Sequence, residues 1–432
     1  MRKQFFIALL LVAITGKAAV PAFQTFVSSF VVGYRELHIP EIGYGYRDYF
    51  TAIPGAEQLD RQEAFFKKYE EGLAAYKRAK LSIPDRVVYD HLAYEVAFNL
   101  QRIKLEKEWV AAGREMPQGG LSGLNNIATW YPLFVQRFTT VSMPPGDVLA
   151  FGEQEVRKVK SEIATLQEQL GFSDSATFYM HLNSETFFIT DKEQLLFSFE
   201  EIDKWVRQKL SAFIGTSDVP LIYAMEWPEA TAFTPPGIYL NRADNAYGKD
   251  VFQFNFYNGR YNKRAMEWLY MHEAIPGHHL QFSLQHESNS LQDLFFYPGN
   301  FEGWACYVEY FGKDVGLYSD PYMYLGKWEW DLVRSVRLVL DVGIHYYGWS
   351  REKALAYWKK AVPNQDDIAE REVTRVTDWP CQALSYKMGA AQIFKMQKWW
   401  QQQHTGSPLS DFRKAFLAFG RLPLPVIEKN IS

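Results

Sequence analysis

A short histidine-rich segment carries the residues best suited to metal chemistry. It reads HEAIPGHH at residues 272–279 and holds three of the nine histidines in the chain. A neutral imidazole is a strong ligand for zinc, and a carboxylate beside a zinc-bound water can accept the proton of that water. The segment is therefore a distorted relative of the His-Glu-x-x-His zinc motif, and it predicts a zinc hydrolase.

The distortion lies at Pro276, which predicts a break in the helix that carries the motif. Proline lacks a donor N–H, and its ring clashes with the carbonyl of the residue four positions earlier, here His272. If two residues are looped out at the break, His278 arrives where the second ligand normally lies. In a continuous helix His279 would return to the face of His272, but about 10 Å further along the axis. We expect His278 to be the second ligand and keep His279 as the alternative, or as a neighbour of the metal site.

Glu302 is the strongest candidate for a third ligand. It lies in a mostly apolar and aromatic run, residues 301–310, where a buried carboxylate is costly unless it is paired or bound to metal. Two histidines and one glutamate leave a coordination position open for water, as a catalytic zinc site requires. The sequence thus predicts one zinc ion per chain, with Glu273 as the general base.

Four segments resemble the bacterial family called domain of unknown function 885, which we place among the gluzincins, the zinc peptidases with a glutamate as third ligand. They are HEAIPGHHLQ at residues 272–281, FEGWA at 301–305, DVGIHYYGWS at 341–350 and QALSYKMG at 382–389. The chain also resembles, more distantly, angiotensin-converting enzyme and the thimet oligopeptidases. Their second histidine ligand directly follows a glycine, as His278 does here, so the resemblance favours His278. Cys381 and Val342 depart from the family pattern, at positions where glycine and threonine are expected.

The resemblance also implies two residues that complete the chemistry. Attack of water on a peptide carbonyl builds negative charge on the carbonyl oxygen, and a donor placed there stabilises the transition state. The distant relatives use a tyrosine and a histidine for this purpose, and Tyr386 and His345 stand at the matching positions. We expect Arg337 to pair with Asp341 four residues later on a helix.

The fold class expected is mainly α, a large helical gluzincin-type fold with a small β-sheet beside the metal-binding helix. Apolar residues at three- and four-residue spacing predict helices over 58–80, 85–110, 145–170 and 191–214. Residues 237–240 and 251–256 predict strands, the second alternating as a half-buried strand does. We divide the chain into an N-terminal helical part, 23–215, and a zinc-binding part, 216–432, which together form one peptidase unit.

The first residues predict export. Arg2 and Lys3 precede an apolar run over 5–14, and small residues follow, so residues 1–22 are typical of a signal peptide. We expect a periplasmic or extracellular protein without stable membrane insertion after cleavage; an uncleaved anchor is the alternative. With a net charge of −4 and no basic runs interleaved with aromatics, the composition argues against a nucleic-acid partner. The oligomeric state is left open.

The function expected is hydrolysis of peptide bonds in a peptide substrate by an exported zinc metallopeptidase. A zinc amidase that acts on a non-peptide amide is the alternative enzyme. A peptide-binding protein on a peptidase fold is the alternative of another class, although a pure binder has no need for Glu273 beside the metal. Arg375 and Lys387 are weaker candidates for binding a substrate carboxylate.

Overall fold

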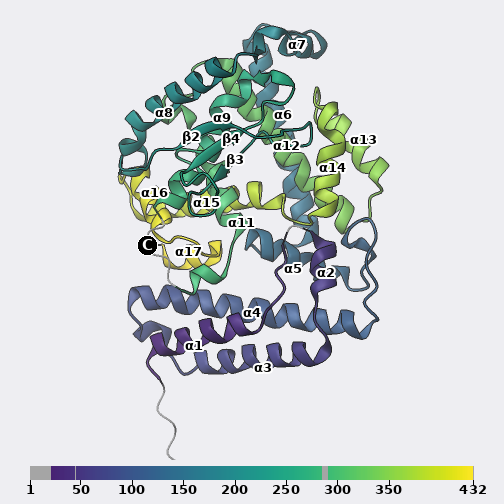
Figure 1. Cartoon of the computed structure of the whole chain (residues 1–432), viewed down its shortest axis with the longest axis vertical. Helices are drawn as coiled ribbons and strands as arrows, with labels where there is room; N and C mark the ends of the chain where they lie inside the picture. The colour runs from purple at the N-terminus through teal and green to yellow at the C-terminus, as the bar shows by residue number, and fades with distance from the viewer. Residues whose placement is uncertain (1–20, 44, 285–289, 432) are drawn as a thin grey trace, which may run out of the picture.

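The structure is a computed structural model, and it describes residues 21–43, 45–284 and 290–431 (Figure 1). Nearly all of the expected signal peptide, residues 1–22, lies outside these ranges. Within them, none of the helices combines the length and the apolar character that crossing a bilayer would need.

The described residues are mainly helical, as the sequence predicts. The first half of the chain forms α1 (Phe23–Glu36), α2 (Tyr46–Ala52), α3 (Ala56–Leu73), α4 (Ile83–Ala111), α5 (Ile127–Thr139), α6 (Pro145–Gln169), α7 (Ser175–Leu182) and α8 (Lys192–Ile214). The second half forms α9 (Met266–Glu273), α10 (His278–Ser283), α11 (Pro298–Glu309), α12 (Pro321–His345), α13 (Arg351–Ala361), α14 (Ala369–Asp378), α15 (Leu384–Gln403), α16 (Leu409–Ala418) and α17 (Leu424–Asn430).

Local signals explain where several helices begin. The Asp191 side chain caps α8 by accepting hydrogen bonds from the backbone N–H groups of Glu193 and Gln194, at 2.9 and 3.3 Å. The Ser82 hydroxyl accepts from the backbone N–H of Asp85 at the start of α4. The Gly- and Pro-containing stretch 112–126 separates α4 from α5, as expected.

A small sheet precedes the helix that carries the histidine motif. Its strands are β2 (Tyr223–Glu226), β3 (Gly237–Leu240) and β4 (Val251–Phe254), in the order β2-β4-β3, with β2 parallel and β3 antiparallel to β4. A second pair joins β1 (Phe188–Ile189) to β5 (Tyr261–Asn262) in antiparallel register. β3 therefore lies at one edge of the three-stranded sheet.

The prediction of a half-buried strand was wrong for β4, because all four of its residues are buried. β4 is the central strand, with β2 and β3 paired along its edges, and other side chains cover both of its faces. Phe252 and Phe254 pack against Phe199 of α8, with ring centroids 5.0 and 5.4 Å apart. On the opposite face, the Gln253 side chain donates a 3.0 Å hydrogen bond to the hydroxyl of Tyr247.

The hydrophobic core joins the two parts of the chain, residues 23–215 and 216–432. Each of the three buried clusters contains side chains from both parts of the chain: α8 packs with α9 and α11, α6 and α7 pack with α12, and α1 to α5 pack with parts of α12 and α15. The layer of α1, α3 and α4 (Figure 1) also contacts the C-terminal helix α17, where Lys429 and Asn430 bond to Asp90 at 2.7 and 2.9 Å.

Candidate metal centre

The helix that carries the histidine motif breaks at the position that Pro276 predicts. α9 ends at Glu273, α10 begins at His278, and the Ile275–Pro276 peptide bond between them is cis. The chain passes so close to itself here that a Cβ on Gly277 would lie 2.0 Å from the carbonyl oxygen of His272, so only glycine fits. The break brings His278 against His272, with ring centroids 4.8 Å apart.

A close crossing of α11 and α15 positions the other side of the site. A Cβ on Gly303 would lie 2.7 Å from Cα of Gly389, so the two backbones approach as only paired glycines allow. Glu302 precedes Gly303, and Tyr386 lies about one turn before Gly389 on α15. The ring of Tyr386 is nearly parallel to the ring of His272, with centroids 6.1 Å apart and an interplanar angle of 12°.

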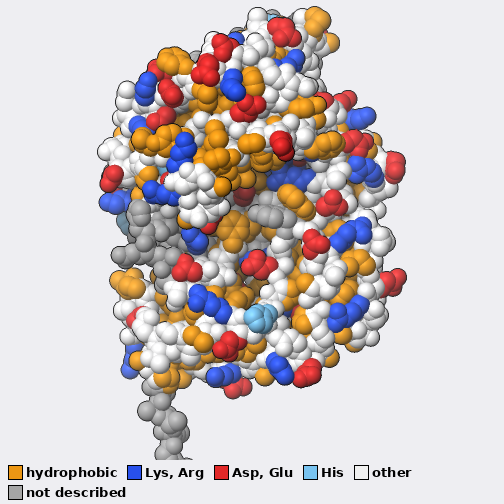
Figure 2. Space-filling view, viewed as in Figure 1, with side chains coloured by type: hydrophobic (Ala, Val, Ile, Leu, Met, Phe, Trp, Pro, Cys, Tyr) orange, Lys and Arg blue, Asp and Glu red, His pale blue; other side chains and the backbone are white. Residues whose placement is uncertain are grey.

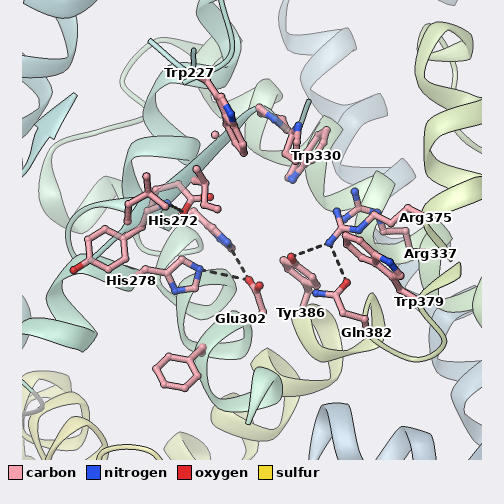
Figure 3. A pocket seen from close by; sticks show the side chains of 18 of the residues that line it. Trp227, His272, His278, Glu302, Trp330, Arg337, Arg375, Trp379, Gln382 and Tyr386 are labelled. Atoms are coloured by element: carbon pink, nitrogen blue, oxygen red, sulfur yellow. Dashed lines mark hydrogen bonds and ion pairs between the residues drawn. The ribbon is translucent and has the colours of Figure 1, made fainter. Parts of the chain in front are cut away.

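Three potential ligand atoms converge between these elements (Figure 3). Oε2 of Glu302 lies 3.3 Å from Nε2 of His272 and 3.5 Å from Nε2 of His278, and the three atoms are all within 4.8 Å of one another. Zinc bonds of about 2.0–2.2 Å in a tetrahedron place neighbouring ligand atoms about 3.3–3.5 Å apart. The two separations from Oε2 of Glu302 match that spacing.

Two polar atoms of these three side chains lack a hydrogen-bond partner among the described residues. Oε2 of Glu302 and Nδ1 of His278 are buried, and neither has a hydrogen-bond partner of acceptable geometry among the described residues. Burial alone would raise the pKa of Glu302, but the interactions with His272 and His278 hold it well below its usual value. The carboxylate is therefore ionised, and the donor set fits a divalent cation.

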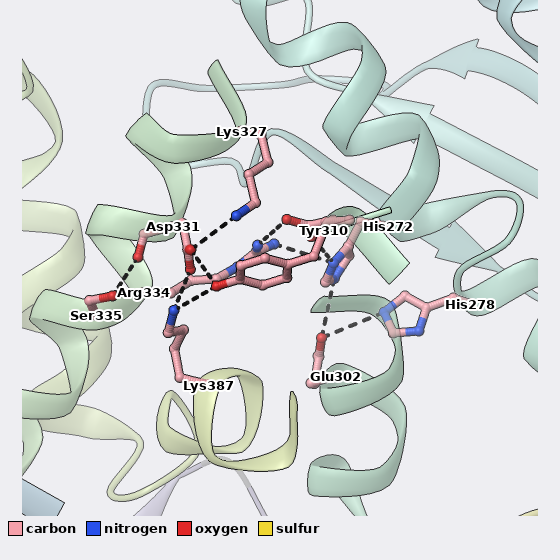
Figure 4. Close-up of polar contacts among 10 residues, drawn as sticks. His272, His278, Glu302, Tyr310, Lys327, Asp331, Arg334, Ser335 and Lys387 are labelled. Carbon is pink, nitrogen blue, oxygen red and sulfur yellow. Dashed lines mark hydrogen bonds and ion pairs between the residues drawn. The ribbon is translucent and has the colours of Figure 1, made fainter. Parts of the chain in front are cut away.

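A second layer of charged residues fixes the tautomer of His272. Oε1 of Glu309 lies 2.7 Å from Nδ1 of His272, and Nη1 of Arg334 donates to Oε2 of Glu309 at 2.6 Å. Arg334 approaches His272 from the side opposite to His278 (Figure 4). Burial would raise the pKa of Glu309, but the charge of Arg334 lowers it, so Glu309 is an acceptor. With a metal bound, His272 would therefore carry its proton on Nδ1 and present the lone pair of Nε2 to the ion. Because that Nδ1 donates, its 3.2 Å approach to Nη2 of Arg334 is a contact and not a hydrogen bond.

His279 points away from the converging atoms. Its Nε2 donates a 2.8 Å hydrogen bond to the carbonyl of Pro220, and its ring packs 5.5 Å from that of Tyr239. The structure thus brings together His272, His278 and Glu302 and leaves His279 outside the set. His272 also belongs to a tight group with Cys306 and Glu309. Both oxygens of Glu309 already accept hydrogen bonds, from His272 and Arg334, so this group orients His272 and is not a second metal site.

The three ligands open into a cavity of about 810 Å³. Glu273 and Tyr386 line it, and much of the remaining wall is apolar or aromatic: Trp227, Phe233, Pro235, Pro236, Ile238, Leu240, Phe282, Phe296, Phe301, Trp330 and Trp379. Oε2 of Glu273 accepts a 2.8 Å hydrogen bond from the main-chain N–H of Tyr239 in the edge strand β3. The predicted base therefore lies beside both the ligand set and the sheet edge.

Tyr386 adds a neutral donor to the same cavity. Burial first, and then the nearby Glu302 carboxylate, raise the pKa of its phenol above the ordinary value. The phenol therefore keeps its proton at neutral pH. Its oxygen accepts a 3.2 Å hydrogen bond from Nη2 of Arg375, and its own proton remains available for another acceptor.

His345, the other predicted donor, is not among the residues that line the cavity. It is fully buried, its Nδ1 accepts from the backbone N–H of Leu121 at 3.2 Å, and its Nε2 donates to the carbonyl of Val376 at 2.7 Å. Both ring nitrogens thus tie α12 to the 112–126 segment and to α14, and neither can reach a substrate in the cavity.

The expected Arg337–Asp341 ion pair was also wrong. Arg337 donates to Glu372 at 2.6 Å, while Asp341 accepts from the hydroxyl of Tyr131 and the backbone N–H of Cys381 at 2.8 and 2.7 Å. The sequence named Arg375 as a weaker candidate for binding a substrate carboxylate, but it gave no sign that Arg371 lines the same cavity wall. Arg337 and Arg371 line the cavity beside Arg375, and both pair with Glu372. Because Glu372 is distant in sequence from Arg337, no local pattern predicts that pair.

Comparison with known proteins supports the fold. Residues 105–431 match the family model described as "Bacterial protein of unknown function (DUF885)". A "putative lipoprotein of unknown function" from Shewanella oneidensis has a similar structure, with a TM-score of 0.73 and 15% identity over 95% of this chain and 99% of its own. A "putative lipoprotein" from Colwellia psychrerythraea gives a TM-score of 0.66 and 21% identity over 95% of this chain and 73% of its own. None of the curated proteins compared with the chain matches it.

Proposed function

The chain belongs to the bacterial DUF885 family, and we propose that it is an exported zinc metallopeptidase of the gluzincin type. One observation carries the proposal. Nε2 of His272, Nε2 of His278 and Oε2 of Glu302 lie at zinc-ligand spacing on the wall of a large cavity, with the Glu273 carboxylate on the same wall. When bound there, zinc supplies a Lewis acid that polarises a carbonyl and makes water more acidic.

The residues of the chain supply the remaining groups for hydrolysis. Glu273 is placed to take a proton from the attacking water and to return it to the leaving amine. Its hydrogen bond from Tyr239 occupies Oε2 and fixes the direction of the carboxylate. Tyr386 can donate its phenolic proton to a carbonyl oxygen that develops negative charge, because its ring lies beside His272 and its pKa is raised.

The shape and chemistry of the cavity favour a peptide as the substrate. β3 is an edge strand, and the N–H of Tyr239 is directed to Glu273, away from the paired strand β4. This edge can therefore offer main-chain groups to an extended peptide, as in β-strand addition. The aromatic residues on the wall provide apolar contact for side chains. A small non-peptide amide would use neither feature.

Metal analysis combined with peptide cleavage tests the proposal. We expect the purified chain to hold about one zinc ion and to cleave members of a mixed peptide library, and we expect chelation to abolish cleavage reversibly. Glu302→Ala should lose the metal, because two histidines alone form a weaker site. Glu428→Ala is a matched control, since Glu428 pairs with Lys395 near the surface. Full zinc content in Glu302→Ala would contradict the ligand set. Zinc binding without cleavage of any peptide would favour the amidase or the binding protein.

A further inference from the structure

One wall of the cavity carries more positive than negative charge. Arg337 of α12 and Arg371 and Arg375 of α14 all line it. In Figure 3 the guanidinium groups of Arg337 and Arg375 lie together across the cavity from His278, with Tyr386 between them and Glu302. These groups belong to the same cavity as the ligand set but make no contact with the ligands themselves.

A single carboxylate serves these arginines through its two oxygens. Arg337 donates to Oε2 of Glu372 at 2.6 Å, and Arg371 donates to Oε1 at 3.0 and 3.1 Å. Asp378, the other acidic residue of α14 that lines the cavity, is exposed, and it forms no ion pair with an arginine among the described residues. The carboxylate of Glu372 therefore pairs with two of the three arginines, and Arg375 forms no hydrogen bond with it.

Arg375 has only neutral partners. Its Nη2 donates to the side-chain oxygen of Gln382 at 3.0 Å and to the hydroxyl of Tyr386 at 3.2 Å. Nε of Arg375 and Nη2 of Arg337 are buried and have no hydrogen-bond partner among the described residues. A buried guanidinium without an anionic partner is unfavourable. Because the guanidinium group of Arg375 lies on a cavity wall, a bound ligand can supply the negative charge that the protein does not place there.

The distance from the metal ligands suits a short piece of peptide. The ring centroid of Tyr386 lies 6.1 Å from that of His272. The guanidinium carbons of Arg375 and Arg337 lie 5.8 and 5.9 Å from the centroid of the Tyr386 ring. One extended residue spans about 3.3–3.6 Å. The guanidinium carbons thus lie no more than about 12 Å from the ring of His272. One or two residues, with a polar contact at each end, can span that distance.

Resting on the metallopeptidase function proposed above, we propose that Arg375, supported by Arg337, binds the terminal carboxylate of the substrate, so that the enzyme removes one or two residues from the carboxyl end of peptides. Guanidinium and carboxylate groups match in geometry and charge. In the reaction, water adds its hydroxyl to the scissile carbonyl, the C–N bond breaks, and the proton held by Glu273 passes to the leaving amine. The released fragment keeps the carboxylate that Arg375 binds.

Two peptides of one sequence, one with a free C-terminal carboxylate and one with a C-terminal amide, test this site on the full zinc-loaded chain. We expect mass spectrometry to show loss of one or two C-terminal residues from the acid. Loss of a charged hydrogen bond reduces binding about 10- to 100-fold, so kcat/KM for the amide should be lower by that factor or more. Arg375→Gln should lower kcat/KM for the acid similarly and bring the ratio of kcat/KM for acid and amide close to one. Arg351→Gln is the control, since Arg351 lies outside the cavity and pairs with Glu370 at the surface.

Binding to Glu273→Gln separates this site from the proposed activity. By calorimetry, this variant should bind the acid about 10- to 100-fold more tightly than the amide, and Arg375→Gln added to it should remove the difference. Cleavage of acid and amide at equal rates would overturn the carboxylate site while the peptidase function stood. If neither peptide is cleaved, preferential binding of the acid that depends on Arg375 still supports the site, and equal or absent binding overturns it.

Discussion

The main-chain N–H of Tyr239 donates a 2.8 Å hydrogen bond to the side chain of Glu273. Tyr239 lies in the edge strand β3 and Glu273 is the last residue of α9, so this bond joins the sheet edge to the helix that carries His272. A substrate strand held at that edge would pass directly beside the predicted base. In the proposed function, this hydrogen bond would hold the base beside the backbone of a bound peptide.

Glu273→Gln should abolish catalysis without loss of the metal. The glutamine oxygen can still accept the hydrogen bond from Tyr239, but the amide cannot take a proton from water. We expect kcat to fall by about 100-fold or more, as is typical for removal of a general base. Zinc content and thermal stability should match those of the unchanged chain. If the zinc were lost with Glu273→Gln, Glu273 would have to be a ligand.

The neighbouring histidines form a matched pair for testing the ligand set. His278→Ala should lose both zinc and activity, because Nε2 of His278 faces Glu302 at 3.5 Å. His279→Ala should keep the zinc, because Nε2 of His279 is bonded to the carbonyl of Pro220. It should instead lose stability, since His279 is fully buried. Metal analysis of the two variants side by side decides between them, and the reverse pattern would contradict the helix break at Pro276.

His345→Ala should affect stability and leave turnover unchanged. The substitution leaves the buried N–H of Leu121 and the carbonyl of Val376 without their partner. Each unsatisfied buried group costs about 1–3 kcal/mol, so we expect a loss of about 2–6 kcal/mol in the free energy of unfolding. Urea unfolding measures the loss, and kcat of the folded protein serves as the second readout. A large fall in kcat at full stability would return His345 to the catalytic residues.

Acid should destabilise the N-terminal helices through His91. Burial lowers the pKa of this histidine to about 3, and its Nε2 donates to the hydroxyl of Tyr297 at 2.7 Å. An unfolded chain binds the same proton near pH 6.5. Between these values only the unfolded state is protonated, so stability falls by about 1.4 kcal/mol for each pH unit as the pH decreases. His91→Gln should show a smaller slope when both chains are unfolded in urea at several pH values between 4 and 7. Equal slopes would exclude His91 as the cause.

The parts of the site that are close together in sequence were predictable. The motif at 272–279 contains two of the converging side chains, and Pro276 and Gly277 indicate where the helix must break. Glu302 stood out because a carboxylate in an apolar run requires a partner. The structure places these side chains together on short and buried elements.

Interactions between distant segments were not predictable from local patterns. Glu309 and Arg334 support His272 from two different helices, and Glu372 displaces Asp341 as the partner of Arg337. The expected ion pair between residues four apart on a helix forms only where no stronger partner lies on a neighbouring helix. Here α14 places Glu372 beside Arg337. The burial of β4 was misjudged for the same reason. Its alternating sequence cannot reveal that α8 packs on one face of the strand and that Tyr247 contacts Gln253 on the other.

Tyr386→Phe should lower kcat more than it changes KM. The substitution removes one hydrogen-bond donor and keeps the ring beside His272, so the loss appears mainly when charge develops on the carbonyl oxygen. Removal of such a donor typically costs about 3 kcal/mol in the transition state, or about 100-fold in kcat. Arg375 retains its bond to Gln382, so stability should change little. Tyr310→Phe is the control, because the hydroxyl of Tyr310 bonds to Asp331 outside the cavity, and its loss should reduce stability and not turnover. Similar kcat values for Tyr386→Phe and the unchanged chain would show that Tyr386 serves only to hold Arg375.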